Sequence, residues 1–170
     1  YNGAAQTYEV IGLPAGVEAT YTYTLNGVEV SEMVDAGAYT VKVTFTSEGY
    51  NIKAEDAVKE VNFTITKKKV TLSDVVFDNV TLEYDGAEKP LPEATNADMF
   101  NVDYVADGDR VNAGSFTVIA TFTLKDEYVA NYVIDGDGSK KATVTIAPKK
   151  VSVNATLDGA TSVYDGAVKT

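Results

Sequence analysis

The residues best suited to chemistry in this sequence are the acids of the stretch DGDGS. Asp135, Asp137 and Ser139 alternate there, which is the opening spacing of a calcium-binding loop. The sixth position of that loop is Lys140, where glycine is required, and the twelfth is Ile146, where a bidentate acid is required. We therefore expect a solvated turn between strands, and we keep these three residues only as secondary metal candidates.

Other acids could serve two further purposes. The stretch ADGDR at residues 106–110 could offer carboxylates to a calcium ion shared between neighbouring domains. A glycosidase pair needs one acid raised in pKa by burial beside a second that stays ionised. The remaining acids lie among polar neighbours, which favours a solvated surface; they include Glu48, Glu55, Asp56, Glu60, Glu83, Glu88 and Glu93.

The sequence contains no histidine and no cysteine. This removes the commonest general base, the usual metal ligand, the Ser-His-Asp triad and any thiolate nucleophile or disulfide. An internal Lys–Asn isopeptide bond would need a lysine inside an apolar strand, but Lys42 is on the outward phase of its strand and residues 67–69 form a polar run. We expect no enzyme activity and no cofactor.

The overall charge limits the partners. A net charge of −11 and a pI near 4.3 repel polyphosphates, so nucleic acid and anionic lipid surfaces are poor partners. No apolar run approaches the roughly 20 residues of a membrane span, so we expect no direct membrane insertion. With 45% hydrophobic residues, the chain has enough apolar material for packed cores.

Three landmarks recur about 80 residues apart, which indicates tandem duplication. DAGAYTVKVTFT at residues 35–46 matches NAGSFTVIATFT at 112–123, and VNFTITKKKVTL at 61–72 matches ATVTIAPKKVSV at 142–153. The third landmark is a Tyr-Asp/Asn-Gly triplet, found at Tyr1-Asn2-Gly3, Tyr84-Asp85-Gly86 and Tyr164-Asp165-Gly166. Its tyrosine could stack on a sugar ring, but recurrence in every unit favours a turn with a half-buried anchoring ring.

The elements that carry these landmarks are predicted to be strands. Residues 40–46 alternate Thr or Lys with Val and Phe, and residues 17–25 alternate in the same way before the turn pair Asn26-Gly27, which predicts a β-hairpin. Strands are also expected at 61–66 and 142–147, and residues 48–60 fit a helical turn or a long loop equally well. Gly37 and Gly114 precede strands and indicate turns that need a left-handed or Cβ-free residue. The pattern predicts an all-β fold of antiparallel sandwiches.

The ordered set Tyr-Asp-Gly-Ala-x-Lys, GLPAGVEATYTYTLNG, VDAGAYTVKVTFT, GYN and TITKKKVTL resembles the MBG and YDG type domains of large bacterial surface adhesins. The resemblance covers nearly the whole chain. It implies tandem immunoglobulin-like β-sandwich repeats in an extracellular protein of the cell surface or cell wall, acting as a stalk or fibre, with no fixed catalytic set. The second copy lacks the segment Gly12 to Gly16, so a ligand role of that segment would not extend to both copies.

The repeat predicts three domains: residues 1–66, a repeat lacking its first strand; residues 67–148, a complete repeat; and residues 149–170, the first strand and Tyr-Asp-Gly turn of a third. Either the sequence is a window from a longer repetitive chain, or tails 149–170 complete first repeats head to tail. The overlap of residues 164–170 with residues 1–7 counts against the second explanation. The alternative function is a module that binds host glycan or matrix through exposed loops.

Overall fold

The computed structural model describes residues 1–155 and residue 166. Strands dominate this part of the chain and a single helical turn accompanies them, so the all-β prediction is confirmed. In chain order the elements are β1 (Glu18–Leu25), β2 (Val28–Val30), β3 (Gly37–Thr46), β4 (Val58–Ile65), β5 (Lys68–Val70), β6 (Val80–Glu83), β7 (Phe100–Asp107), β8 (Gly114–Leu124), α1 (Asp126–Val129), β9 (Tyr132–Ile134) and β10 (Ser139–Ala147).

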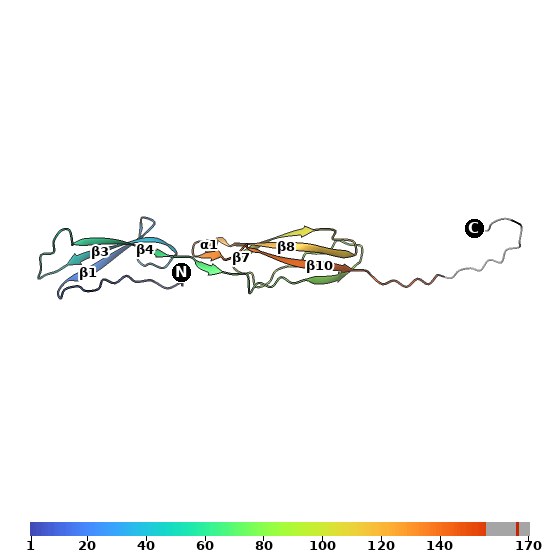
Figure 1. The fold of residues 1–170 in the computed structure, drawn as a ribbon, viewed down its shortest axis with the longest axis horizontal. Helices are drawn as coiled ribbons and strands as arrows, with labels where there is room; N and C mark the ends of the chain where they lie inside the picture. Colours follow the sequence, from blue (N-terminus) through green and yellow to red (C-terminus); the bar gives the residue numbers. More distant parts are fainter. Residues whose placement is uncertain (156–165, 167–170) are drawn as a thin grey trace.

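The strands form two four-stranded sheets and one two-stranded sheet. The first has the order β2-β1-β3-β4, the second has the order β6-β10-β8-β7, and β5 pairs with β9. Figure 1 shows the two larger sheets one after the other along the long axis. We call residues 1–66 unit 1 and residues 67–148 unit 2.

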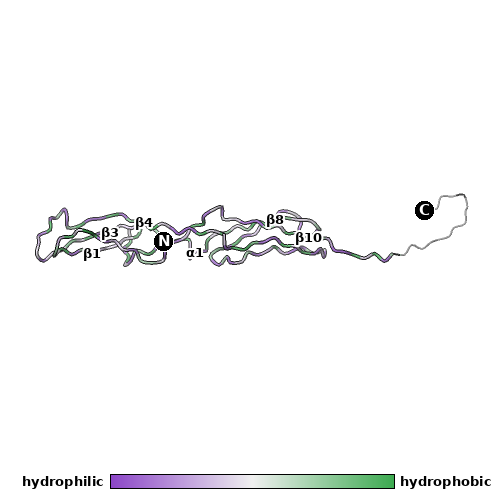
Figure 2. The backbone as a smooth tube through the Cα atoms, turned by 60° about the horizontal axis from the view of Figure 1, so that its bottom comes forward, coloured by the Kyte–Doolittle hydropathy of each residue, from purple (hydrophilic) through white to green (hydrophobic). Residues whose placement is uncertain are grey.

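The central strands follow the alternation seen in the sequence. Val41 and Val43 of β3 are buried, as are Val118 and Phe122 of β8, while neighbouring threonines are more exposed. β3 and β8 are each antiparallel to both of their neighbours. Figure 2 shows polar and apolar residues interleaved along both units, as expected for strands with one wet face.

The predicted hairpin is present. Asn26 and Gly27 both have positive φ, 49° and 86°, and Leu25 pairs with Val28 across the turn. Positive φ at both turn positions matches the right-handed twist of the flanking strands, and Asn-Gly tolerates it best.

The expectation of two packed antiparallel sheets needs correction in two respects. β6 pairs with β10 in parallel, and β5 pairs with β9 in parallel. Within the described residues of unit 2, the buried face of the sheet is covered by irregular extended segments, with one isolated bridge between Val76 and Thr95. Parallel pairing joins strands more than 60 residues apart, and local alternation carries no signal for such a partner.

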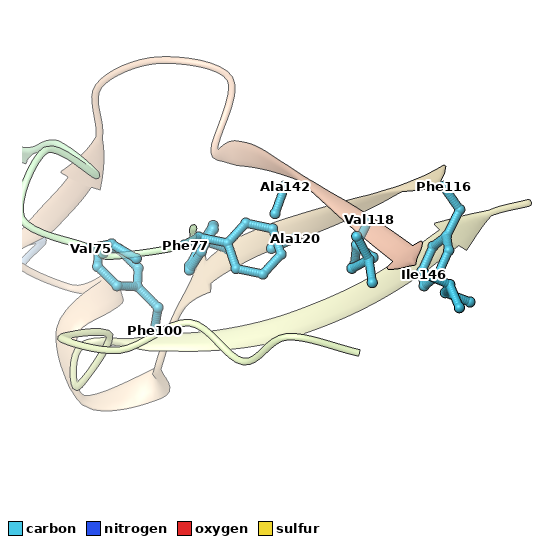
Figure 3. Packing of buried hydrophobic residues seen from close by; sticks show 10 residues of the cluster. Val75, Phe77, Phe100, Phe116, Val118, Ala120, Ala142 and Ile146 are labelled. Atoms are coloured by element: carbon cyan, nitrogen blue, oxygen red, sulfur yellow. The ribbon is translucent and has the colours of Figure 1, made fainter. Parts of the chain in front are cut away.

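Each unit has its own core. In unit 2 the cluster of buried apolar residues has ten members, and Figure 3 shows it extending along the sheet from Val75 and Phe100 to Phe116 and Ile146. In unit 1 the cluster has only five members: Met33, Tyr39, Val41, Val43 and Ile65. Neither cluster includes residues of the other unit, so the two sheets fold around separate cores.

Of the two structures that the sequence allows for residues 48–60, a helical turn or a long loop, the loop is present. Residues 48–60 contain a hydrogen-bonded turn, with Asp56 N donating to Lys53 O, and no helix. The helix α1 occurs instead at the corresponding end of unit 2. Asp126 and Glu127 occupy its first turn, where negative charge is favoured by the exposed N–H groups, and Lys125 N donates to Met99 O just before it.

Candidate functional site

The connection between the two units is very short. β4 ends at Ile65 and β5 begins at Lys68, so only Thr66 and Lys67 lie between them. β5 then pairs in parallel with β9, and Lys68 N donates to Asn131 O at 2.9 Å. The chain therefore enters unit 2 as part of a ladder and has almost no free linker.

Asn131 connects the units through its side-chain amide. Its Nδ2 donates to Asp35 Oδ1 at 2.8 Å, and its Oδ1 accepts from Ala36 N at 2.7 Å. Asn131 N also donates to Tyr128 O at 3.1 Å, which ties the residue to the turn α1. Both polar atoms of one planar amide are therefore hydrogen-bonded to the loop before β3 of unit 1. Two such bonds restrict the orientation of the loop relative to Asn131 as well as its distance.

Aromatic rings and a lysine surround this amide contact. The rings of Tyr1 and Tyr132 meet edge to face with centroids 5.4 Å apart, and Tyr128 packs on Tyr132 in the same manner at 5.9 Å. Lys67 Nζ donates to Val129 O at 2.6 Å. Such pairs add attraction beyond their buried area, so the junction combines directional bonds with packed rings. We call residues 35–36, Lys67 and Asn131, with the rings of Tyr1 and Tyr132, the junction.

The Tyr-Asp/Asn-Gly triplets occupy matching places in the two units. Tyr1 N donates to Thr66 O at 2.5 Å, and Tyr84 N donates to Ala147 O at 2.9 Å. Both tyrosines are half-buried against their cores. Each triplet therefore ties the start of its segment to the end of the last strand of the same unit.

The turns that follow the tyrosines also match. Asn2 Oδ1 accepts from Ala4 N at 3.0 Å, and Asp85 Oδ1 accepts from Ala87 N at 2.9 Å. The glycines between them, Gly3 and Gly86, have φ of 77° and 81°. Residues that have a Cβ rarely adopt this backbone conformation, which explains why glycine occupies both positions. In the third triplet Gly166 has φ 77° and is exposed, whereas Tyr164 and Asp165 lie outside the described residues.

Sequence reasoning missed Lys89. This side chain is only 6% exposed, and its Nζ lies 2.6 Å from Asp85 Oδ1. The hydrogen bond from Lys89, followed by that from the Ala87 N–H, holds the pKa of Asp85 below its ordinary value. Unit 1 has an uncharged version of this contact, Gln6 Nε2 to Asn2 Oδ1 at 3.1 Å. The spacing of Asp and Lys in YDGAEK, repeated as Asn and Gln in YNGAAQ, was the available signal.

Gly37 and Gly114 begin β3 and β8, but for different reasons. A Cβ on Gly37 would lie 2.4 Å from Leu25 Cδ1, whereas Gly114 has φ 153° and open space around it. The first position needs a residue without a Cβ, and the second needs an unusual backbone conformation.

The acidic candidates are occupied by protein contacts. Asp135 pairs with Lys69 at 3.1 Å, and Asp137 Oδ1 accepts from Ser139 N at 3.0 Å, a bond that lowers the pKa of Asp137. In the stretch at residues 106–110, Asp109 accepts from Val111 N and from Asn112. Across residues 1–155, no group of three or more acids lies together as a metal site would require.

Three cavities follow β4 in unit 1. The first, of about 240 Å³, lies between Tyr1 and residues 63–66. The next two, of about 230 and 410 Å³, share Phe45 and Lys59 as lining residues and continue toward Ile52. We call this line of cavities the unit 1 groove. A separate cavity of about 430 Å³ lies between Gly16 and Tyr50, near Ile52 in the sequence.

One comparison with known proteins gives a match, and it covers the first part of the chain. Residues 1–69 match the family model of the MBG domain, which confirms the resemblance for this segment. No curated protein and no solved structure matches the chain. In the part of the chain that the structure describes, no helix is long and apolar enough to cross a membrane.

Proposed function

We propose that this chain, which carries an MBG domain at residues 1–69, is a non-catalytic spacer in a bacterial surface protein. Its two units are tandem repeats held end to end as a stiff rod. The rod displays another part of the protein at a distance from the cell envelope, so that the chain works outside the cell as a stalk or fibre segment.

The junction is the observation that carries this proposal. A flexible tether between independent domains needs free linker residues, but here two residues separate β4 from β5. Asn131 bonds to Asp35 and Ala36 with both ends of its amide. Bending the units against each other breaks these bonds and separates the two tyrosine rings, so the connection resists tilt.

The residue inventory supports the non-catalytic part. Without histidine or cysteine, a hydrolytic or transfer reaction would fall to acids, lysines or hydroxyls. The candidate acids Asp135 and Asp137 are engaged by Lys69 and by a backbone N–H. The charge of −11 favours solubility and mutual repulsion of neighbouring stalks over binding to polyanions.

The proposal is tested by the stiffness of the chain. Small-angle X-ray scattering and residual dipolar couplings of the 170-residue chain should report one shared alignment tensor for both units. Asn131→Ala removes both bridging hydrogen bonds, worth about 1–3 kcal/mol together, and should give separate tensors and a wider distribution of lengths. Asn101→Ala, at an exposed position of β7, is the matched control. Independent tumbling of the units in the unaltered chain would refute the spacer role.

A ligand-binding role is the second candidate, favoured by one observation. Gly16, the last residue of the segment Gly12–Gly16, lines the cavity of about 430 Å³; Ser47 Oγ donates to Gly16 O, and Tyr50, which also lines the cavity, is 61% exposed. An exposed tyrosine that lines a cavity can stack on a sugar ring. Binding of the chain to a glycan array would favour this role if Tyr50→Ala abolishes the binding and Tyr128→Ala does not.

A further inference from the structure

Tyrosine is the residue type from which this chain loses an electron most readily. The sequence has eleven tyrosines and no cysteine, tryptophan or histidine. Of its two methionines, Met33 is fully buried and Met99 is half-buried. Thiols and thioethers, the usual targets of oxidation, are therefore absent or sheltered. A one-electron oxidant that reaches the surface produces phenoxyl radicals on tyrosine rings, and two such rings in contact can join covalently.

Three tyrosine rings meet where the two units meet. The ring of Tyr1, in unit 1, contacts the ring of Tyr132, in unit 2, with centroids 5.4 Å apart and planes at 71°. Tyr128 of α1 packs on Tyr132 at 5.9 Å and 75°. An edge-to-face pair at such a separation has its nearest ring carbons about in van der Waals contact. All three residues are half-buried, so solvent still reaches part of each side chain. Figures 1 and 2 both place the N-terminus beside α1.

Hydrogen bonds on both sides hold the rings of Tyr1 and Tyr132 against each other. Tyr1 N donates to Thr66 O at 2.5 Å. Tyr84 makes the same bond to Ala147 O from inside the chain, so this ring position is a property of the repeat and needs no free amino group. Asn131, the neighbour of Tyr132 in the chain, is bonded to unit 1 through both polar atoms of its amide. The contact is therefore a fixed part of the junction.

We propose that the junction is a site of oxidative cross-linking, in which Tyr1 and Tyr132 become a dityrosine that joins the two units covalently. The oxidant is a haem peroxidase acting with hydrogen peroxide. Each tyrosine gives up one electron and its phenolic proton. The two radicals form a carbon–carbon bond between ring positions ortho to the hydroxyls, and the hydrogens on those carbons then move to the oxygens and restore both phenols. Hydrogen peroxide takes up the two electrons and two protons and becomes water.

The position of this pair distinguishes it from the other tyrosine pairs. Within the described part of the chain, the remaining tyrosine rings in contact lie inside one unit: Tyr21 with Tyr23 on β1, stacked at 6.5 Å, and Tyr128 with Tyr132. Coupling in either of those pairs closes a small loop and leaves the junction as it is. A bond from Tyr1 to Tyr132 joins residues far apart in the sequence, so it constrains the chain strongly and opposes tilt between the units.

The charge of the chain favours a bond within one molecule. A net charge of −11 disfavours encounters between copies, so a radical meets the ring already beside it first. A role for the bond outside the cell rests on the proposed function, whereas the chemistry rests on the junction alone. Independent tumbling of the unoxidised units refutes the spacer role, and absence of the cross-linked peptide refutes the present inference, so the two can fail separately.

Peptide mapping of the full chain after brief oxidation tests the bond. With peroxidase and limiting hydrogen peroxide in dilute solution, we expect dityrosine fluorescence in a product that stays monomeric. Cleavage after lysine should yield a species that joins residues 1–42 to residues 126–140 and lacks two hydrogen atoms relative to the separate peptides. Fragment ions should assign the bond to Tyr1 and Tyr132. Cross-links only between copies, or only within residues 126–140, overturn the proposal.

Tyrosine-to-phenylalanine variants remove the phenol and keep the ring packing. Tyr1→Phe and Tyr132→Phe should each abolish the species that joins the two peptides. Two controls remove a tyrosine elsewhere and should leave its yield unchanged: Tyr84→Phe, at the position in unit 2 that matches Tyr1, and Tyr50→Phe, which removes a ring that is 61% exposed. Persistence of the species in either junction variant, or its loss in the controls, contradicts the assignment.

The fixed contact is tested by loosening the junction. Asn131→Ala should lower the initial rate of cross-linking several-fold, because the rings no longer stay together, whereas Asn101→Ala on β7 should not change it. Once purified in its cross-linked form, the Asn131→Ala chain should regain one alignment tensor for both units. Equal rates in the two variants, or separate tensors in the cross-linked chain, would count against a bond across the junction.

Discussion

The separate sheets of unit 1 and unit 2 have corresponding strands and hydrogen bonds, but the layers that cover the two sheets differ. In both, a tyrosine hydroxyl accepts from a backbone N–H ten or eleven residues earlier: Tyr21 of β1 accepts from Val10, and Tyr104 of β7 accepts from Ala94. The covering layer differs, because unit 2 includes Val75 and Phe77 whereas unit 1 has the groove. The central strands of the sheet therefore form with or without a complete covering layer. The covering layer determines how many core residues are buried.

The largest expected effect tests this difference in core. Phe122 is 2% exposed inside the ten-member cluster, and Phe45 occupies the matching position beside the groove, half-buried. Phe122→Ala should destabilise unit 2 by about 3–5 kcal/mol, whereas Phe45→Ala should cost unit 1 less than about half of that. Amide hydrogen exchange, resolved by unit, measures both. Equal losses would show that the groove is as well packed as the core of unit 2.

A second pair of substitutions tests the two glycines that begin β3 and β8. Gly37→Ala should cost about 1–2 kcal/mol through contact with Leu25, and Leu25→Ala in the same chain should relieve most of the added cost. Gly114→Ala meets no neighbour, so its cost comes from φ of 153° and no single side-chain truncation should relieve it. A double-mutant cycle by urea denaturation measures the coupling, and a zero coupling for Gly37 and Leu25 would contradict the steric account.

The smallest effect concerns pH. Because the folded pKa of Asp85 is lowered chiefly by the bond from Lys89, its contribution to stability is present above the unfolded pKa of about 3.9 and is lost as pH falls through the folded pKa. Unit 1 has the neutral Asn2 at this position. The stability of unit 2 should therefore fall more steeply below pH 4, and Asp85→Asn should flatten that slope. Hydrogen exchange at pH 3 and pH 5 measures it; an unchanged slope would contradict the assignment.

Local sequence patterns predicted the central strands of both sheets well. Alternation located β1, β3, β4 and β10 to within a few residues, and the pair Asn26-Gly27 located the hairpin. These features depend on neighbours within a few residues, which is the range that alternation and turn chemistry report.

The covering layer and the junction could not be predicted in the same way. The parallel partners of β5 and β6, and the contact of Asn131 with Asp35, join residues far apart in the sequence, and no periodicity marks them. The turn α1 is too short for a helical period to be visible. The burial of Lys89 could not be predicted either, because burial of a charge depends on a partner that only the folded turn brings within reach.

The parallel pairing of β6 with β10 has a mechanical consequence. Force that enters unit 2 through Lys68 and leaves after Ala147 pulls the start of one strand against the end of its neighbour. Because the two strands are parallel, this force loads the pairs from Val80–Val144 to Glu83–Ala147 in shear. All of these pairs bear the load together and do not open one after another. Tension along the chain therefore loads the backbone hydrogen bonds between β6 and β10 in shear, the direction in which they resist separation most.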